Sequence, residues 1–157
     1  MNRTVAILDT ILAWLAGMLF GALFLVTVLN IVLRNLGGIT WLWIPGMTKL
    51  LFIWTVFTGT AVLYQRHDHL VMDFFSSKFA PSRKRILEIA TNLMFLGFLL
   101  VLVIYGFIVV EIRLGIPFET WNLSTAYAFL AVPVTAILMV FFCANKLIRL
   151  FKGETIE

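Results

Sequence analysis

Four long apolar runs determine what this chain can fold into. Three of them contain no charged residue, and the other, which is shorter, carries Lys49 near its start. A helix needs about 20 mostly apolar residues to cross the hydrocarbon core of a bilayer, and the aliphatic stem of a lysine can extend to the interface. The runs therefore predict four transmembrane helices, over residues 11–33, 47–64, 89–110 and 126–144.

The composition agrees with a membrane protein. Hydrophobic residues make up 62% of the chain and charged residues 13%, whereas soluble domains average about 45–50% and about 25%. Outer-membrane barrels are excluded because their strands alternate apolar and polar residues. The single cysteine, Cys143, excludes an internal disulfide and a cysteine-based metal centre. We expect one all-α integral membrane domain over residues 1–157.

The basic residues predict the orientation of these helices. The N-terminal tail, the second loop and the C-terminal tail share one side of a four-helix protein and carry nine of the twelve Lys and Arg residues. Because short cytoplasmic loops are enriched in Lys and Arg, both termini are expected in the cytoplasm, and in a bacterium the protein would lie in the inner membrane. This asymmetry accounts for the net charge of +4 without nucleic acid.

The second loop contains the most ionisable stretch, "RHDHLVMDFF", at residues 66–75. Residues 70–79 predict a short helix in the cytoplasmic interface, because ten residues with a polar side cannot span. On such a helix His69 and Asp73 are four residues apart and share a face. We interpret them as a structural corner. The alternatives are a lipid-headgroup or partner contact through Arg66 and the basic cluster at residues 83–85, and a metal site, which would need a further ligand and a shielding shell.

Catalytic and transport chemistry is missing from the helices. Their middles contain no ionisable residue, which a proton relay or solute path would need. Both histidines lie in a loop, so axial haem ligands are absent from the spans. We therefore predict no enzyme activity and no cofactor. Two alternatives stay open: a self-contained homo-oligomeric small transporter, and a membrane anchor for a redox enzyme.

Small residues and a proline supply the distinctive packing features. Ala13, Gly17 and Gly21 recur every four residues, and such strips let helices approach closely in lipid. This strip serves either packing within the chain or contact with another protein. Pro133 interrupts the hydrogen bonding of the fourth helix, which predicts a kink. Trp43, together with Trp41, precedes the second helix as an aromatic belt would. Three further glycines are too isolated to interpret: Gly59, Gly97 and Gly106.

Several segments, in order, resemble the small membrane subunit of tripartite ATP-independent periplasmic (TRAP) transporters. They are "NIVLRNLGG" (30–38), "WLWIPGMTKLLFIWTVFTGTA" (41–61), "HLVMD" (69–73) and "FLAVP" (129–133). The second segment places Trp43, Lys49 and Trp54 at the family's Trp-x-x-Glu-x-x-Arg/Lys-x-x-Phe-x-Trp pattern. Gly46 departs from it, since the family usually has Glu there. Ser124 also replaces an Ile-Pro that often opens the fourth helix.

The resemblance implies a role and partners. In that family a periplasmic binding protein captures an organic anion, such as a C4-dicarboxylate or sialic acid. A larger membrane subunit, a separate chain, then moves it with sodium ions, and the small subunit acts as a scaffold. The expected contacts with that subunit are Arg34, Trp43, Lys49, Trp54, Gly17, Gly21 and Pro133. We also predict that Arg34, Lys49 and the loop over residues 111–125 face the periplasm, where either the binding protein or the outer edge of the large subunit contacts them.

Overall fold

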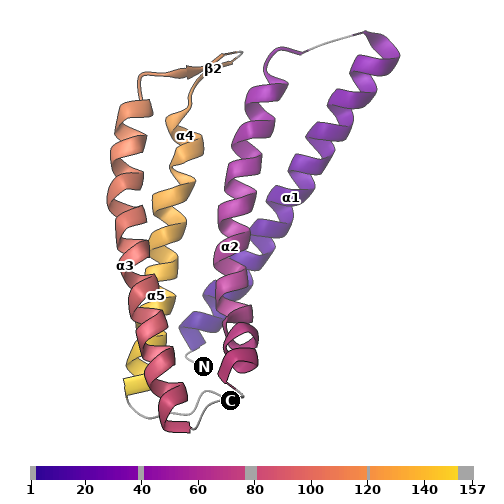
Figure 1. Ribbon diagram of the computed structural model, residues 1–157. Helices are drawn as coiled ribbons and strands as arrows, with labels where there is room; N and C mark the ends of the chain where they lie inside the picture. Colours follow the sequence, from indigo (N-terminus) through magenta and orange to yellow (C-terminus); the bar gives the residue numbers. More distant parts are fainter. Residues whose placement is uncertain (1–2, 39–40, 77–80, 120, 152–157) are drawn as a thin grey trace.

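The computed structural model describes residues 3–38, 41–76, 81–119 and 121–151. Its elements in chain order are α1 (Arg3–Gly37), α2 (Ile44–Ser76), α3 (Pro81–Arg113), β1 (Pro117–Phe118), β2 (Trp121–Ser124), α4 (Ala126–Phe129) and α5 (Ala131–Phe151). The helices stand side by side (Figure 1). We call the end where α1 begins and α5 ends the base, and the end with the strands the top.

The prediction of four spanning helices is confirmed. Each predicted span lies within a helical stretch that is long and apolar enough to cross a membrane, and these stretches are Val5–Leu36, Ile44–Arg66, Ile86–Arg113 and Ala126–Ile148. Half of the residues in the apolar window of the fourth stretch are buried, against 6% in the first. The fourth helix is therefore central and α1 is peripheral.

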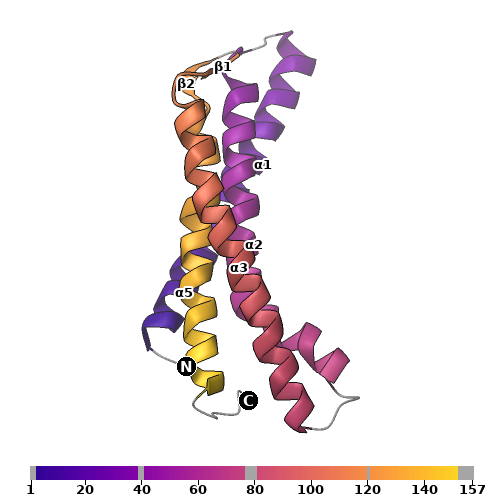
Figure 2. The same ribbon diagram turned by 60° about the vertical axis from the view of Figure 1, so that its left-hand side comes forward.

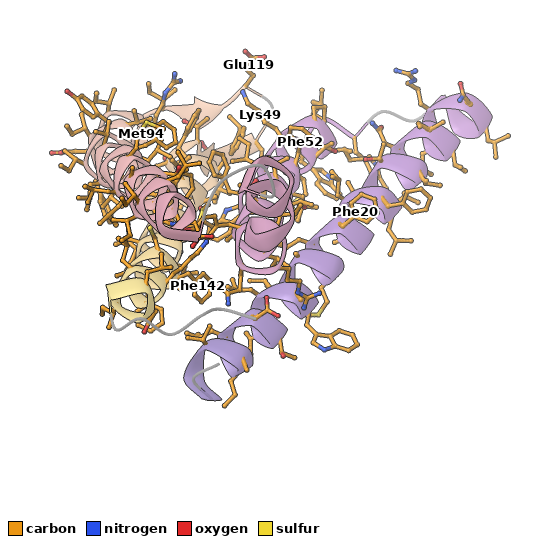
Figure 3. All side chains as sticks on the ribbon, turned by 60° about the horizontal axis from the view of Figure 1, so that its bottom comes forward. Phe20, Lys49, Phe52, Met94, Glu119 and Phe142 are labelled. Atoms are coloured by element: carbon orange, nitrogen blue, oxygen red, sulfur yellow. The ribbon has the colours of Figure 1, made fainter. Side chains whose placement is uncertain are left out.

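The apolar clusters agree with a central fourth helix and a peripheral α1. A first apolar cluster joins α2, α3 and α5 around Ala61, Leu99 and Cys143. A second cluster forms near the base, where Leu12 of α1 packs against Phe142 of α5. In Figure 3 Phe142 extends from α5 toward α1, and α1 lies to one side of the other helices. Toward the top α1 diverges from α3 and α5 (Figure 1), so its attachment to α5 is near the base.

The fourth spanning helix is interrupted, as its proline predicts. The helix α4 ends at Phe129 and α5 begins at Ala131, with Leu130 between them. Pro133 has no N–H to donate to the carbonyl of Phe129 and its ring crowds that carbonyl. The Leu130 amide still bonds Ala126 O at 2.8 Å, and the Val134 amide bonds Leu130 O at 3.3 Å. The chain thus continues in the same direction through a local disturbance.

A small hairpin between α3 and α4 was not expected from the sequence, which predicts only helices. The strands β1 and β2 pair antiparallel, with an irregularity between Pro117 and Phe118. The Thr125 amide and hydroxyl both donate to Ile116 O at 2.9 Å, which closes the hairpin. The hairpin fixes the connection across the top of the bundle.

The second loop also differs from the expectation. Residues 70–76 continue α2 without a break, whereas we predict a separate helix over 70–79; residues 77–79 lie outside the described part. No Gly or Pro occurs between Gln65 and Ser76 to end α2 earlier. In Figure 2 the last turns of α2 point away from the bundle.

Candidate functional site

The top of the bundle carries three of the predicted contact residues on its surface. Arg34 lies in the last turn of α1 and Lys49 in the second turn of α2, and both are exposed. Trp43 stacks on Trp41 with their ring centroids 5.9 Å apart, and both rings remain partly exposed. Neither Arg34 nor Lys49 forms an ion pair with any other described residue. Their charges are therefore available to water, lipid headgroups or a partner.

The hairpin is seated on the first turn of α2. Phe118 is buried, and a Cβ placed on Gly46 would lie 3.5 Å from its Cβ and Cγ. Trp121 stacks on Phe118 with centroids 6.5 Å apart. A glycine at position 46 thus leaves room for an aromatic ring from the hairpin, a contact that links two segments more than 70 residues apart.

The end of α3 is tied to the start of α4. Ser124 Oγ donates to the carbonyl of Arg113 at 2.9 Å and accepts the amide of Ala126 at 3.2 Å. The Arg113 guanidinium lies 5.2 Å from the ring centroid of Phe129. Ser124 therefore accepts one of the free amides at the start of α4, whereas a proline at position 124 has no side-chain oxygen to accept it.

Trp54 connects α2 to α4. Its indole Nε1 donates to the carbonyl of Tyr127 at 2.9 Å, just before the interruption at Leu130. The Trp54 side chain is half-buried. The indole N–H of Trp54 therefore forms its hydrogen bond within the chain, and only the ring is left to contact a partner.

Pro133 and Gly106 meet at the same level. Pro133 is fully buried, and a Cβ placed on Gly106 of α3 would lie 3.1 Å from Pro133 Cδ. Nothing in the sequence singles out Gly106, because its neighbour is on another helix. Since Pro133 is covered by its own chain, it can influence a partner only through the shape of the fourth helix.

The small-residue strip of α1 is open. A Cβ placed on Gly17 or Gly21 would have no atom within 4 Å, and Gly17 is exposed. These glycines are therefore not required by packing within the described chain, which leaves a partner helix or lipid to cover them.

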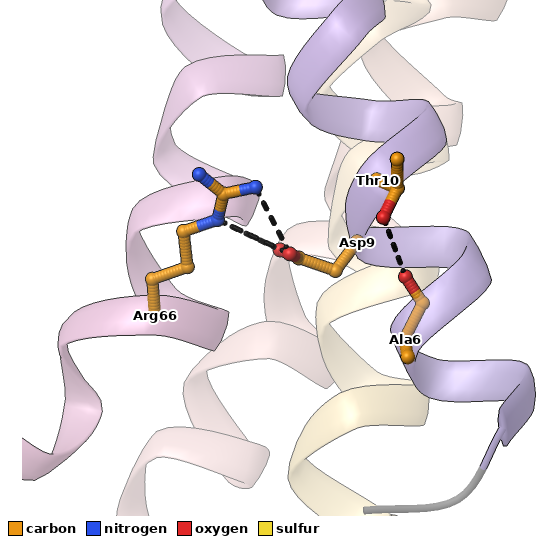
Figure 4. A network of polar contacts seen from close by, with 4 residues as sticks. All are labelled: Ala6, Asp9, Thr10 and Arg66. Atoms are coloured by element: carbon orange, nitrogen blue, oxygen red, sulfur yellow. Dashed lines mark hydrogen bonds and ion pairs between the residues drawn. The ribbon is translucent and has the colours of Figure 1, made fainter.

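An ion pair that the sequence analysis missed joins α1 to α2 near the base. Arg66 Nε lies 3.1 Å from Asp9 Oδ2, and Arg66 Nη2 lies 3.0 Å from the same oxygen (Figure 4). The Asp9 side chain is 17% exposed and that of Arg66 is 49% exposed. The two residues are separated by 57 positions, and Asp9 precedes the predicted first span. Only the antiparallel arrangement of α1 and α2 brings them together.

A buried polar cluster was also missed. Tyr64 of α2 donates to Asn92 Oδ1 at 3.3 Å, and Asn92 Nδ2 donates to the carbonyl of Glu88 at 2.8 Å. Cys143 Sγ lies 3.4 Å from Asn92 O. Asn92 is thus the point where α2, α3 and α5 share hydrogen bonds, which explains how a buried amide is tolerated there.

Metal-binding and titrating groups are sparse in the described part of the chain. No three of its His, Cys, Asp and Glu residues come together as metal ligands could. The side chains of His69 and Asp73 lie outside the described residues, so their pairing stays a prediction. Their backbones belong to one helix, α2, four positions apart.

Comparison with known proteins decides the family. Residues 23–153 match the family described as tripartite ATP-independent periplasmic transporters, DctQ component. The chain belongs to this family. The match begins within α1 and includes the whole of the other three spanning stretches and the hairpin.

A named TRAP relative supports the assignment. The chain is 29% identical over 149 residues to the sialic acid TRAP transporter permease protein SiaT of Haemophilus influenzae (strain 86-028NP). The alignment covers 92% of this chain but 22% of the relative. This DctQ-family chain therefore spans about a fifth of the length of that permease, most of which has no counterpart here.

The structure gives physical reasons for two departures from the TRAP pattern. The Phe118 ring occupies the space beside Gly46, where a longer side chain such as Glu would compete with it. Ser124 bonds both Arg113 and Ala126. Both departures thus occur where the hairpin meets the helices.

Proposed function

We propose that this chain is the non-catalytic small permease subunit of a sodium-coupled TRAP importer. It holds the large membrane subunit, which carries the solute across the membrane. Its family supports this assignment, because transporters of this kind contain more than one component. The length of the sialic acid relative agrees with it, since the greater part of that permease lies outside the aligned segment.

One observation about the helices supports an accessory role for this chain. All residues of the four spanning stretches that are charged at neutral pH lie within six positions of an end: Asp9, Arg34, Lys49, Arg66, Glu88, Glu111, Arg113 and Lys146. Except for Thr48, the threonines of these stretches bond carbonyls of their own helices, as Thr55 bonds Leu51 O at 2.7 Å and Thr135 bonds Ala131 O at 2.6 Å. Their hydroxyls are thus committed to the backbone. Coupled transport of an anion needs charged or polar groups at mid-membrane, so we place the transport site on another chain.

The orientation and solute class complete the proposal. The base is cytoplasmic, because the N-terminal tail, the second loop and the C-terminal tail share one side of a four-helix protein and carry nine of the twelve Lys and Arg residues. The top then faces the periplasm, where Arg34, Lys49 and the hairpin meet the binding protein. The solute is an organic anion such as sialic acid or a C4-dicarboxylate, in line with the name of the aligned permease. The outward-pointing end of α2 lies in the cytoplasmic interface, with His69 and Asp73 at its corner.

Uptake in a strain that lacks its own importers tests this function. The large subunit, the binding protein and this chain are expressed together, and each is omitted in turn. Labelled sialic acid and succinate are offered with and without a sodium gradient. We expect uptake of one of them only with all three proteins and with sodium. Uptake by this chain alone in liposomes would contradict the proposal.

A further inference from the structure

One face of α3 presents an exposed row of residues at four-residue spacing. Leu93, Val101 and Tyr105 are 61%, 50% and 63% exposed, and Gly97, between them, is also exposed. A Cβ placed on Gly97 would have no atom within 4 Å. We call these four residues the α3 strip. The rest of the described chain leaves this strip uncovered.

Tyr105 places a hydroxyl where the bilayer offers it no partner. No hydrogen bond involves its Oη within the described part of the chain. Tyr105 lies eight residues before Arg113, about 12 Å below the top end of the span at 1.5 Å per residue. Side chains on a helix lean toward its N-terminus, and the N-terminus of α3 is at the base. The hydroxyl therefore points deeper into the membrane, toward the middle of a hydrocarbon core about 30 Å thick.

The other tyrosines avoid this problem. Tyr64 bonds Asn92. Tyr127 is 56% exposed but lies at the start of α4, which runs from top to base, so its side chain leans toward the top interface. The same reasoning applies to Trp14 of α1, whose helix begins at the base and whose ring leans toward the base interface. Tyr105 is therefore the tyrosine whose side chain is directed away from the nearer membrane–water interface.

An unpaired hydroxyl in hydrocarbon is unfavourable, and an acyl chain cannot bond it. The occupant of the α3 strip must therefore bring a polar group to the depth of Tyr105 within the hydrocarbon core, which a protein helix can do. Gly97, two turns away on the same face, lets the backbone of such a helix come close. The exposed residues of α1, such as Met18 and Leu25, have no polar group that needs a hydrogen-bonding partner, so lipid can cover them.

We propose that the α3 strip is the docking face for a spanning helix of the large membrane subunit, which supplies a hydrogen-bonding group to Tyr105 Oη. This inference rests on the proposed function and deepens it, because it specifies which face of the small subunit the partner covers. The α1 strip with Gly17 and Gly21 is then left to lipid.

Photocrosslinking in native membranes tests the docking face. The tagged chain carries Val101→p-benzoylphenylalanine, and a matched variant carries Leu25→p-benzoylphenylalanine on the exposed face of α1. Each is expressed with the large subunit, illuminated and purified. We expect a covalent adduct of the two chains from position 101, at about tenfold higher yield than from position 25. Equal yields, an adduct with a second copy, or no protein adduct would overturn the docking face.

Purification without illumination distinguishes a failure of the docking face from a failure of the proposed function. If the large subunit co-purifies but position 101 gives no adduct with it, the docking face is wrong and the proposed function stands. If no large subunit co-purifies, the proposed function fails and the docking face fails with it.

A second variant tests the hydrogen bond alone. Tyr105→Phe keeps the ring and removes the hydroxyl, so the helix itself is preserved. We expect the association constant of the two subunits in detergent to fall about threefold to twentyfold, the range that interhelical hydrogen bonds in membranes give. Tyr127→Phe, at the interface, should leave it unchanged. An unchanged constant for Tyr105→Phe would overturn the role of the hydroxyl.

Discussion

Gly106 of α3 lies directly against Pro133 of α5, where the fourth spanning helix is interrupted. A Cβ on Gly106 would approach Pro133 Cδ to 3.1 Å and the Pro133 nitrogen to 3.3 Å. Trp54 donates a hydrogen bond to Tyr127 O on the other side of the interruption. The disturbed turn is thus held from α2 and from α3, so we expect it to be rigid.

Gly106→Ala should destabilise the chain. The added methyl group meets the backbone and ring of Pro133, neither of which can move alone, and overpacking of this kind costs about 1–3 kcal/mol. The gain in helix propensity, about 1 kcal/mol, offsets part of that. We expect a lower midpoint of thermal unfolding in detergent. Gly59→Ala is the control, because a Cβ there meets no atom within 4 Å, and it should not lower the midpoint. A midpoint for Gly106→Ala equal to that of the control would contradict the close contact.

Trp54→Phe should loosen the start of the fourth helix. It removes the bond to Tyr127 O, and interhelical hydrogen bonds in membranes contribute about 0.6–1.7 kcal/mol. Faster amide exchange of residues 126–131, measured by mass spectrometry, is the expected result. Trp14→Phe, on the exposed face of α1, should leave that exchange unchanged. Unaltered exchange in Trp54→Phe would show that the bond does not hold this turn.

Asp9→Asn should weaken the attachment of α1 near the base. It removes the charge that Arg66 contacts through Nε and Nη2. Because Arg66 is about half exposed, we expect a loss of no more than about 1 kcal/mol. The exchanged pair Asp9→Arg with Arg66→Asp should recover part of the loss, which thermal unfolding can measure. Thr10→Ala serves as the control, since Thr10 bonds Ala6 O within α1 (Figure 4). A single variant as stable as the control would rule out a contribution from this pair.

Gly46→Glu should be tolerated only when the hairpin ring is removed. Gly46→Ala should be nearly neutral, because its Cβ would make an ordinary contact with Phe118 at 3.5 Å. A Glu side chain must compete with that ring or displace it, so we expect a loss of about 1–3 kcal/mol. In a Phe118→Ala background the same substitution should cost clearly less. Equal costs in the two backgrounds, by thermal unfolding, would show that positions 46 and 118 are independent.

The sequence predicts the spanning helices well because their determinant is local: a run of uncharged residues long enough for a bilayer. Pro133 is equally local, since it removes a hydrogen bond from its own helix. The hairpin at residues 117–124 was missed because its strands are too short to show alternation. The partners of Asp9, Gly46 and Gly106 were missed because each lies on an element distant in sequence.

The predicted contact residues also divide into those that the sequence places correctly and those whose contacts depend on distant elements. Arg34, Trp43 and Lys49 are at the exposed top, as their position at or near the ends of the spans predicts. For Trp54 and Pro133 the sequence indicated importance but not location, and both contact other helices of the same chain. Tyr105 carries no motif, and only its exposure and the direction of α3 draw attention to it.

The central claim is that this chain works as one component of a larger membrane complex. The most direct measurement is the mass of the assembly purified through a tag on this chain, from native membranes in mild detergent, with identification of every component. We predict one much larger, very hydrophobic chain in an amount equal to this one. Recovery of this chain alone, as a homo-oligomer, would contradict the account and favour a self-contained small transporter.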